Sequence, residues 1–383
     1  MKRSMLILFI ASIVLSACTI TTTTPQAEMP SAASITVEEI DNLPVDLATT
    51  EPEPAINLMD ALGRQVIMDE PPQRIVVTGR AVIMVLDAIY MFPEAYDRVV
   101  TFDNASQSGA NFIKLIDADF DAKATLVQDA GVEQVVVAKP DLVIMKSSQA
   151  EKLGQPLEAL DIPVVYVDLE TPEQYYRDIV ILGQVFQNEA RAQELINAYQ
   201  SRVDAISQAI AISAFKPRVL MLYYTDRDGA VAFNVPPAGW MQTRMTEMAG
   251  ADPIWVSPAL SEGWNKVGLE QIATWDADEI FIISYTSNPS EVVNSLLQDP
   301  QWQGLRAVKE GKLHAFPGDI YSWDQPDSRW LLGLTWMAKT LQSNFLRDVD
   351  ILREAQSFYE LFYGLDEAFF MDQIQPTFRG DLP

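Results

Sequence analysis

Cysteine and histidine are almost missing from this chain of 383 residues, because each of them occurs only once. A single cysteine cannot form an internal disulfide, and it cannot build a CxxC redox or metal motif. Zinc and manganese sites rely on imidazole ligands, so a transition-metal site built from several histidines is excluded. The one histidine, His314, lies in the apolar run LHAF and is predicted to be structural.

Basic residues are also scarce, since the chain has 27 Lys and Arg against 53 Asp and Glu. Nucleic-acid-binding proteins normally carry a basic surface, so this composition argues against nucleic acid as a partner. Any local positive field must come from a few individual lysines or arginines.

The chain lacks the sequence motifs of common hydrolases. It contains neither a G-x-S-x-G nucleophile elbow nor an H-E-x-x-H zinc motif, and it has no second histidine for acid-base work. These absences disfavour an extracellular hydrolase or chelatase. A carboxylate pair of the glycosidase type stays open, because carboxylates are abundant. A membrane-anchored scaffold without a ligand is a further alternative.

The N-terminus is predicted to be a signal peptide. Two basic residues precede an apolar stretch from Met5 to Leu15, which is too short to span a membrane. The stretch ends in Leu-Ser-Ala-Cys, which looks like a bacterial lipobox, the signal for cleavage before Cys18 and for lipid attachment to it. The alternative is plain cleavage after Ala17 with a free thiol at Cys18. A diacylated cysteine would meet the two-chain requirement for stable anchoring.

The segment from Thr19 to Ala55 is rich in Thr, Pro, Ala, Ser and Glu, and it has no sustained apolar period. Such a segment buries too little apolar surface to offset its ordering entropy, so it is predicted to be disordered. As a coil it would span about 35 Å and would tether a folded domain to a membrane.

After this tether, short apolar strands alternate with helices, which indicates βαβ units and parallel sheets. A hairpin is expected around Gly63. The first set has expected strands at 75–78, 98–102, 141–145 and 164–167, and expected helices at 81–91, 133–138 and 151–160. The second set has expected strands at 218–225, 230–233, 279–285 and 312–316, and expected helices at 239–249, 269–275, 290–297 and 328–341. The predicted fold class is therefore α/β, with two Rossmann-like lobes and mainly parallel sheets.

A long helix is predicted between the two sets. From Asn188 to Ala211, apolar residues recur in steps of three and four, and Asn188 is a suitable N-cap. This helix would be about 36 Å long. The helix before it, from Thr171 to Phe186, starts with a capping-box pattern and a proline. We expect the long helix to be the strut between the lobes; the alternative is an ordinary surface helix of one large domain.

A short repeat supports the two-lobe interpretation. The sequence VEQV begins at Val132 and is followed by PDLVI, and LEQI begins at Leu269 and is followed by ADEIF. In both copies, Glu133 or Glu270 precedes the aspartate at the start of an apolar strand by eight residues.

These motifs occur in a specific order along the chain. The main ones are DALGRQVIMDEPPQRIVVTG, GVEQVVVAKPDLVIMKS, LEALDIPVVYVDLETPEQ, GLEQIATWDADEIFIIS, LRAVKEGKLHAFPGDIYSWDQPDSRWLLGLTWMAKTL and FYELFYG. The series resembles the substrate-binding proteins of ABC importers for iron-siderophore complexes, haem and cobalamin, whose two α/β lobes are joined by one long helix. It covers nearly the whole chain after the tether, and it is specific for the family but not for the ligand.

The resemblance implies a division of the chain into six parts. These are a lipoprotein signal peptide (1–18), a tether (19–55), an N-terminal lobe (56–170), connecting helices with the strut (171–214), a C-terminal lobe (215–342) and a C-terminal helical extension (343–383).

The resemblance also implies a partner. In the family, one glutamate on each lobe faces arginines of the permease dimer, which works with a cytoplasmic ATPase. By motif match these would be Glu133 and Glu270. The alternative is that each glutamate only complements the dipole at a helix start.

Ligands of open α/β sheets bind outside the carboxyl ends of the strands, which in a two-lobed protein face the cleft. Arginine binds carboxylates or oxyanions, and aromatic rings supply contact area, so such a cleft would suit a large, partly aromatic anion. The candidate contacts are Arg80, Asp103, Asn104, Lys146, Ser147, Tyr224, Trp240, Trp264, Asn265, Tyr285 and Trp323. Arg80 could instead pair with Asp103, and Trp275, Trp330 and Trp336 are expected to be core residues.

The resemblance implies a monomeric, extracytoplasmic, lipid-anchored protein that captures an iron(III) chelate and delivers it to an importer, without catalysis, cofactor or protein metal site. Cobalamin, haem and molybdate or tungstate are alternative ligands within the family. Haem with a histidine axial ligand is disfavoured by the single His314, whereas tyrosine ligation remains open. One continuous helix resists bending, so modest closure on ligand binding is expected.

Overall fold

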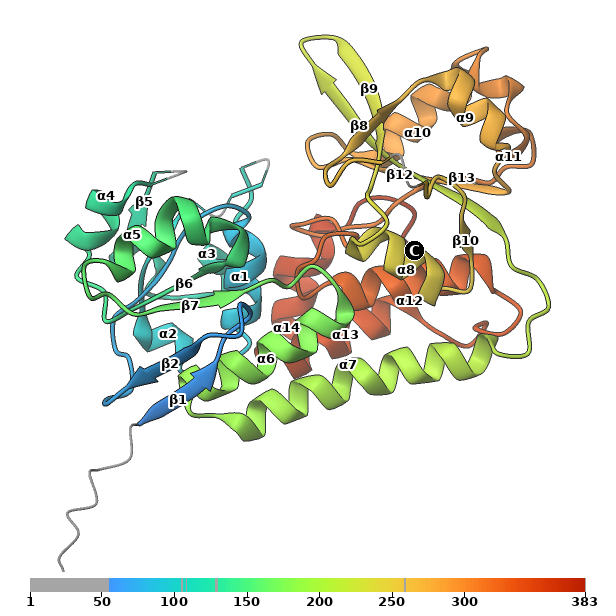
Figure 1. The fold of residues 1–383 in the computed structure, drawn as a ribbon. Coiled ribbons are helices and arrows are strands. Elements are labelled where there is room, and N and C mark those ends of the chain that lie inside the picture. The colour runs from blue at the N-terminus through green and yellow to red at the C-terminus, as the bar shows by residue number, and fades with distance from the viewer. Residues whose placement is uncertain (1–54, 105, 108, 128–129, 258–259, 383) are drawn as a thin grey trace, which may run out of the picture. The chain divides into compact units, whose positions relative to one another are not determined.

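The computed structural model describes residues 55–382 except 105, 108, 128–129 and 258–259. The predicted signal peptide, Cys18 and the tether up to residue 54 lie outside the described residues. Residues 52–383 form one compact unit, and all elements named below belong to it (Figure 1).

The first sheet has five parallel strands in the order β5-β4-β3-β6-β7. They are β3 (Ile75–Val77), β4 (Val99–Asp103), β5 (Ala124–Leu126), β6 (Leu142–Lys146) and β7 (Val164–Val167). Strands β3, β6 and β7 are buried along their whole length and rich in Val and Ile, as expected for a parallel sheet covered on both faces. The strand order reverses between β3 and β6, which marks the topological switch point of the sheet.

Five helices accompany the strands of this sheet: α1 (Val82–Ile89), α2 (Ala95–Arg98), α3 (Phe112–Ile116), α4 (Val132–Val137) and α5 (Gln155–Glu158). The helix expected at 151–160 is shorter, because a π-helical turn over Ala150–Gly154 precedes α5. A Cβ on Gly154 would lie only 1.7 Å from the Tyr166 hydroxyl oxygen. Pro156 follows, and it has no N–H for the helical ladder. The close approach of Tyr166 to the backbone of Gly154 and the proline at position 156 explain why the regular helix begins only at Gln155.

The expected hairpin precedes the first sheet. Strands β1 (Ile56–Met59) and β2 (Gln65–Met68) pair antiparallel, with Ile56 opposite Met68. Gly63 in the turn has a φ of 71°, a conformation that glycine adopts without steric cost. Alternate residues of both strands are buried, so one face of the hairpin packs on the core.

The second sheet is mixed and follows the order β11-β9-β8-β12-β13, with β10 also paired to β8. Its strands are β8 (Arg218–Arg227), β9 (Ala230–Val235), β10 (Asp252–Pro253), β11 (Asn265–Val267), β12 (Glu279–Ile283) and β13 (Leu313–Ala315). Strands β8, β12 and β13 run parallel, and β9 and β11 are antiparallel additions. The helices of this part are α8 (Met241–Met248), α9 (Leu269–Trp275), α10 (Pro289–Gln298) and α11 (Arg306–Lys309).

Two helices connect the sheets. Helix α6 (Pro172–Phe186) is capped by Thr171, whose side chain accepts a hydrogen bond from the Gln174 amide. Helix α7 (Glu189–Ile210) is capped by Asn188, which accepts one from the Arg191 amide. Both caps and the 22-residue length of α7 agree with the sequence prediction. The two lobes joined by one long helix are visible in Figure 1.

None of the helices within residues 55–382, apart from the gaps named above, is both long and apolar enough to cross a membrane.

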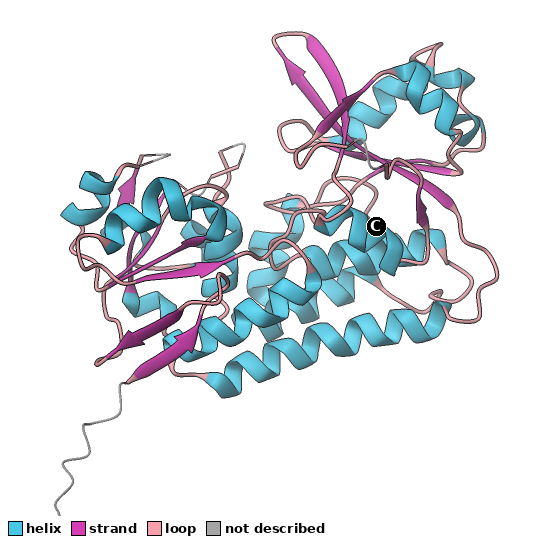
Figure 2. Cartoon of the chain, viewed as in Figure 1, coloured by secondary structure: helices cyan, strands magenta, loops and turns pink. Residues whose placement is uncertain are grey.

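The C-terminal helices α12 (Trp330–Leu341), α13 (Ile351–Tyr363) and α14 (Glu367–Phe369) complete the fold, and α12 contacts both α7 and α13 (Figure 2). Trp330 is fully buried and stacks on Tyr199 of α7 with ring centroids 5.1 Å apart. Trp336 is buried as well, so both are core residues as predicted. Residues 319–329, which we call the junction loop, enter α12 and are all buried.

Gly333 tests how tightly α12 packs on the junction loop. An added Cβ would lie 2.2 Å from the carbonyl oxygen of Trp323, which is a backbone atom and cannot move alone. We expect Gly333→Ala to lower the free energy of unfolding by about 1–3 kcal/mol through overpacking, measured by urea denaturation. Gly304→Ala is the matched control, because nothing lies within 4 Å of its added Cβ. Equal stability of the two variants would contradict this packing.

Candidate ligand-binding site

The carboxyl ends of β3 and β4 border a polar cavity of about 570 Å³, which we call the first-lobe cavity. Its lining residues are Gly79, Arg80, Ala81, Val82, Ile83, Asp103, Asn104, Ser106 and Lys152. The cavity lies at the edge where ligands bind in open α/β sheets, beside the topological switch point. Three of the predicted ligand contacts, Arg80, Asp103 and Asn104, therefore line one cavity.

Asp103 fixes the turn that enters this cavity. Its carboxylate is buried and accepts hydrogen bonds from the Thr78 hydroxyl at 2.8 Å and from the Gly79 amide at 2.9 Å. Gly79 has a φ of 102°, which a residue with a Cβ rarely adopts. Arg80 is exposed, and it forms no hydrogen bond or ion pair within the described part of the chain. The alternative pairing of Arg80 with Asp103 is therefore not observed there, and the guanidinium is available to a ligand.

The amino end of α1 also borders the cavity. Its N-cap residue, Ala81, has no side chain that could accept a hydrogen bond from the helix, and the first turn contains no acidic residue. The amide groups at the start of a helix lack partners within the helix and carry partial positive charge. Together with Arg80, this helix end favours an anionic group in the cavity.

Lys146 and Ser147 make internal contacts instead. Lys146 is buried and forms an ion pair with Glu170, and the Ser147 hydroxyl donates a hydrogen bond to Asp168. Both side chains therefore bind the segment that follows β7. The sequence located them correctly at the end of β6. It could not show that acidic residues after the neighbouring strand β7 bind both side chains.

Four half-buried aromatic side chains gather in the second lobe: Tyr223, Trp240, Trp264 and Tyr285. We call them the aromatic group. Tyr223 lies 4.5 Å from Tyr285 and 4.8 Å from Trp264, measured between ring centroids, and Trp240 lies 5.5 Å from Trp264. Tyr223 lies inside β8, opposite Ile283 at the end of the parallel pairing of β8 with β12, and Tyr285 follows β12 by two residues. Three of the predicted contacts, Trp240, Trp264 and Tyr285, therefore lie side by side.

Tyr224 does not join the aromatic group. Its ring packs 5.8 Å from Phe233, which in turn lies 4.9 Å from Trp302. Successive side chains of a strand point to opposite faces, so Tyr223 and Tyr224 cannot both face the same site. The sequence offered both tyrosines at this strand and favoured Tyr224, because the preceding residues of β8 are buried on both faces, which hides the alternation that would have distinguished the two.

The side chains of two further candidates make internal contacts. The Trp323 side chain is fully buried, donates a hydrogen bond to Asp319 at 2.8 Å and packs edge-on against Phe378. Asn265 closes its own turn, since its amide donates to the Gly263 carbonyl and accepts from the Ser261 amide. The loop position of Trp323 suggested exposure, but the whole junction loop is buried.

The junction loop links the two halves of the candidate site. Asp324 is buried and accepts hydrogen bonds from Tyr285 at 2.7 Å, Gln242 at 3.1 Å and Ser322 at 2.6 Å. Burial raises the pKa of Asp324. The next residue, Gln325, exchanges two side-chain amide hydrogen bonds, of 2.9 and 3.1 Å, with Gln107 of the first lobe.

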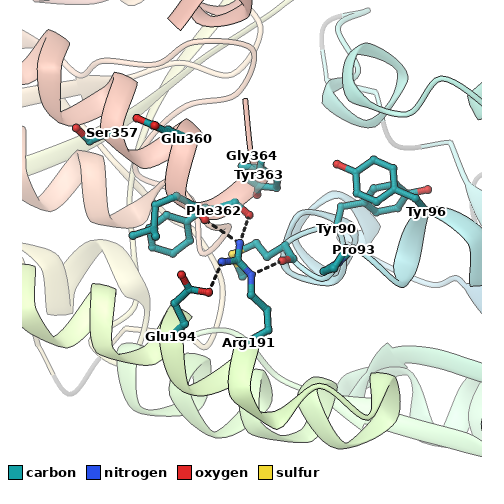
Figure 3. A pocket seen from close by; sticks show the side chains of 12 residues that line it. Tyr90, Pro93, Tyr96, Arg191, Glu194, Ser357, Glu360, Phe362, Tyr363 and Gly364 are labelled. Atoms are coloured by element: carbon teal, nitrogen blue, oxygen red, sulfur yellow. Dashed lines mark hydrogen bonds and ion pairs between the residues drawn. The ribbon is translucent and has the colours of Figure 1, made fainter. Parts of the chain in front are cut away.

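A larger cavity, of about 740 Å³, lies between the end of α1, the start of α7 and α13 (Figure 3). Its most prominent charged side chain, Arg191, is already satisfied. The guanidinium donates to the carbonyl oxygens of Met91, Leu361 and Phe362, and it pairs with Glu194 at 2.7 Å. This cavity is remote from the strand ends, and its arginine holds three segments together, so it is a weaker candidate than the first-lobe cavity.

Glu133 and Glu270 occupy equivalent places in the two lobes. Each is exposed and is the second residue of its helix, α4 or α9. In both helices the N-cap residue is a glycine. Neither carboxylate forms a hydrogen bond or ion pair within the described residues. The repeat seen in the sequence is therefore also a repeat of local structure.

Metal ligands are not clustered in the part of the chain that the structure describes, where no group of three or more His, Cys, Asp or Glu could hold a metal ion. His314 binds Glu279 at 2.7 Å and stacks on Phe281.

Comparison with known proteins gives consistent findings. The sequence profile described as periplasmic binding protein matches residues 75–319. The chain is 23% identical over 332 residues to the molybdate-binding protein MolA of Haemophilus influenzae, covering 79% of this chain and 92% of that protein. It is 26% identical over 208 residues to the achromobactin-binding periplasmic protein of Dickeya dadantii, covering 50% and 62%.

Solved structures agree in fold. MolA of Haemophilus influenzae bound to molybdate has a TM-score of 0.66 at 20% identity, covering 81% of this chain and 98% of that chain. A periplasmic solute binding protein from Veillonella parvula has a TM-score of 0.67 at 23% identity, covering 84% and 99%.

Two buried carboxyl groups are expected to make the free energy of unfolding depend on pH. Burial raises the pKa of Asp178 to about 6, above its usual 3.8, although Asp178 accepts hydrogen bonds from two backbone amides. Burial also raises the pKa of Asp87 to about 6. Each group binds its proton more tightly in the folded protein, so its stabilising contribution is complete below about pH 3.8 and is lost as the pH rises through about 6. We expect a larger free energy of unfolding at about pH 5.5 than at about pH 7.5.

Urea unfolding at the two pH values measures this difference. Asp178→Asn is the control, because an asparagine side chain can still accept hydrogen bonds but does not titrate. The variant is expected to show a smaller difference than the wild type. A stability that is higher at the more alkaline pH would contradict the effect of these buried carboxyl groups.

Proposed function

Because the chain belongs to the periplasmic binding protein family, as a solute-binding protein of an ABC transporter, we propose that its solute is an anionic iron(III) chelate of the siderophore type. The observation that carries the proposal is the presence of two chemically different surfaces, one in each lobe. The first-lobe cavity offers Arg80 and the amino end of α1, and the second lobe offers the aromatic group.

The size of the cavity supports a ligand larger than a simple ion. Its volume of about 570 Å³ falls in the range of about 300–1,000 Å³ that is usual for pockets of small organic ligands. Aromatic rings add contact area with few rotatable bonds, so the aromatic group would hold the organic part of a chelate. The anionic part would lie near Arg80, in a cavity that Lys152 also lines.

Molybdate is the second candidate, because the similarity to MolA extends over most of the chain. An oxyanion fits the amides at the start of α1 and the guanidinium of Arg80. It would leave the aromatic group without a role in binding. Titrating the protein with both ligands separates the two proposals.

Delivery would involve a permease and a membrane. We propose that Glu133 and Glu270 dock the loaded protein on the permease dimer, and that a lipid on Cys18 anchors it outside the cell membrane through the tether 19–55. The two lobes, 56–170 and 215–342, would each present one glutamate. The proposed role requires no catalysis, and the matched relatives are named as binding proteins.

The ligand proposal is tested by tryptophan fluorescence. Ferric achromobactin is expected to quench the full-length protein saturably, because Trp240 and Trp264 belong to the aromatic group. Arg80→Ala is expected to weaken this binding about tenfold or more, since it removes a charge-assisted contact. Arg353→Ala, which removes an exposed arginine on α13, is the matched control and should bind like the wild type.

Saturable binding of molybdate without binding of the ferric chelate would favour the second candidate. Binding of neither ligand, or equal effects of Arg80→Ala and Arg353→Ala, would contradict the proposed site.

The docking proposal is tested by transport. The double replacement of Glu133 and Glu270 with alanine is expected to abolish uptake of labelled ligand in cells that lack the native protein, while ligand affinity stays unchanged. Close pairing of both carboxylates with permease arginines would otherwise fix the orientation of the complex. The control is a double replacement of Glu189 and Glu291 with alanine, since both are exposed glutamates in the first turns of other helices. Normal uptake by the first variant would refute the docking role.

A further inference from the structure

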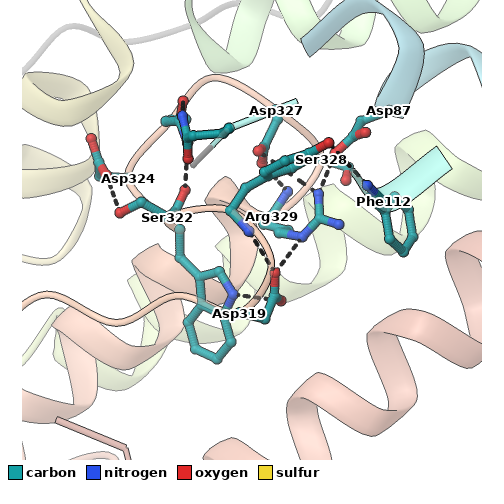
Figure 4. A network of polar contacts seen from close by, with 12 residues as sticks. Asp87, Phe112, Asp319, Ser322, Asp324, Asp327, Ser328 and Arg329 are labelled. Carbon is teal, nitrogen blue, oxygen red and sulfur yellow. Dashed lines mark hydrogen bonds and ion pairs between the residues drawn. The ribbon is translucent and has the colours of Figure 1, made fainter. Parts of the chain in front are cut away.

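Arg329 is a fully buried arginine at the start of α12, and its guanidinium lies among three carboxylates (Figure 4). It forms an ion pair with Asp87 of α1. Its Nε lies 2.9 Å from Asp319 and also donates a hydrogen bond to the Tyr359 hydroxyl at 2.9 Å. The Asp327 carboxylate lies farther away, 3.8 Å from Nη1. The guanidinium thus contacts the first lobe, the junction loop and α13.

Aromatic rings seal this cluster from water. The guanidinium carbon lies 4.3 Å from the ring centroid of Phe112, 5.0 Å from that of Tyr321 and 5.7 Å from that of Tyr359. The Tyr321 hydroxyl accepts a hydrogen bond from the Phe112 amide at 3.0 Å, which is a further polar contact between the first lobe and the junction loop. Ion pairs in such surroundings are poorly screened and depend strongly on geometry.

The two halves of the candidate site are both connected to Arg329. On one side, Asp87 belongs to α1, whose amino end borders the first-lobe cavity. Helix α1 has eight residues and spans about 12 Å, so a contact near its carboxyl end fixes the position of its amino end. On the other side, the junction loop carries Asp324, which holds Tyr285 of the aromatic group.

We propose that Arg329 is a positioning residue that sets the spacing between the first-lobe cavity and the aromatic group. A ligand that must reach both surfaces then depends on this spacing, whereas a small oxyanion held in the first-lobe cavity alone does not. The inference rests on the proposed function and adds to it a residue that selects solutes by size, without touching them.

Asp87→Asn is the most informative change, because it preserves the shape of the side chain and removes the charge that ties α1 to Arg329. Asp327→Asn is the matched control. It neutralises a carboxylate of the same cluster, but Asp327 belongs to the same loop as Arg329 and cannot tie the first lobe to it. An asparagine there can still accept the hydrogen bond that Asp327 receives from the Arg329 amide at 2.8 Å.

The first measurement compares two probes on the full-length protein. Asp87→Asn is expected to weaken binding of ferric achromobactin about tenfold, while binding of molybdate stays within about twofold of the wild type. Asp327→Asn is expected to leave both affinities unchanged. A general structural defect in Asp87→Asn would lower both affinities together and overturn the proposal, as would wild-type affinity of this variant for the chelate.

The second measurement needs no ligand. Spin labels are attached to Val137→Cys on α4 and Ser295→Cys on α10, both exposed sites, in a Cys18→Ser background. Pulsed dipolar spectroscopy is expected to give a broader distance distribution for Asp87→Asn than for Asp327→Asn or the parent. Equally wide distance distributions for the three proteins would overturn the proposal, whether or not the protein binds ferric achromobactin or molybdate. Failure to bind either ligand would by itself contradict only the proposed function.

Discussion

The guanidinium of Arg329 holds together parts of the chain that are far apart in sequence. Asp87 lies in α1, Asp319 and Asp327 lie in the junction loop, and Tyr359 lies in α13. Burial disfavours the charged form of a carboxyl group and raises the pKa values of Asp87 and Asp327. The other carboxylates around this single cation raise them further. A buried charge without a partner is strongly destabilising, so the buried guanidinium of Arg329 depends on its carboxylate partners.

The ligand site follows from this connection. Parallel strands place the residues at their carboxyl ends at one edge of a sheet, so Arg80 and Asn104 meet in one lobe. In the other lobe, Tyr223 lies where the parallel pairing of β8 with β12 ends, and it meets Tyr285, which follows β12. The sheets alone do not determine how these two edges are spaced. The spacing depends on the junction loop, which hydrogen-bonds to Tyr285 through Asp324 and to Gln107 through Gln325. The junction loop is therefore part of the candidate site, in which the sequence analysis proposed Trp323 as a ligand contact.

Several of the predicted ligand contacts make internal contacts, for a shared physical reason. Lys146 and Ser147 lie at the predicted strand end. There Lys146 forms an ion pair with Glu170, and Ser147 donates a hydrogen bond to Asp168. Trp323 lies in a predicted loop, but that loop is buried beneath the C-terminal residues and contacts Phe378. In each case the decisive partner comes from a segment remote in the sequence. Tyr224 is a different case, because it lies on the face of β8 opposite to that of Tyr223. The sequence does not show which face a side chain is on when the strand is buried on both faces.

The sequence by itself determined the local structure and the family. Side-chain periodicity and capping residues gave α6 and α7, including the caps at Thr171 and Asn188, and the repeat gave the equivalent positions of Glu133 and Glu270. These features depend on residues within a few positions of one another, so the sequence contains the whole signal. The tertiary structure was needed to show which strand-end side chains lack a polar partner among the described residues, such as Arg80, and which form ion pairs, such as Lys146. It was needed because the charge and exposure of a side chain depend on partners that folding brings from elsewhere in the chain.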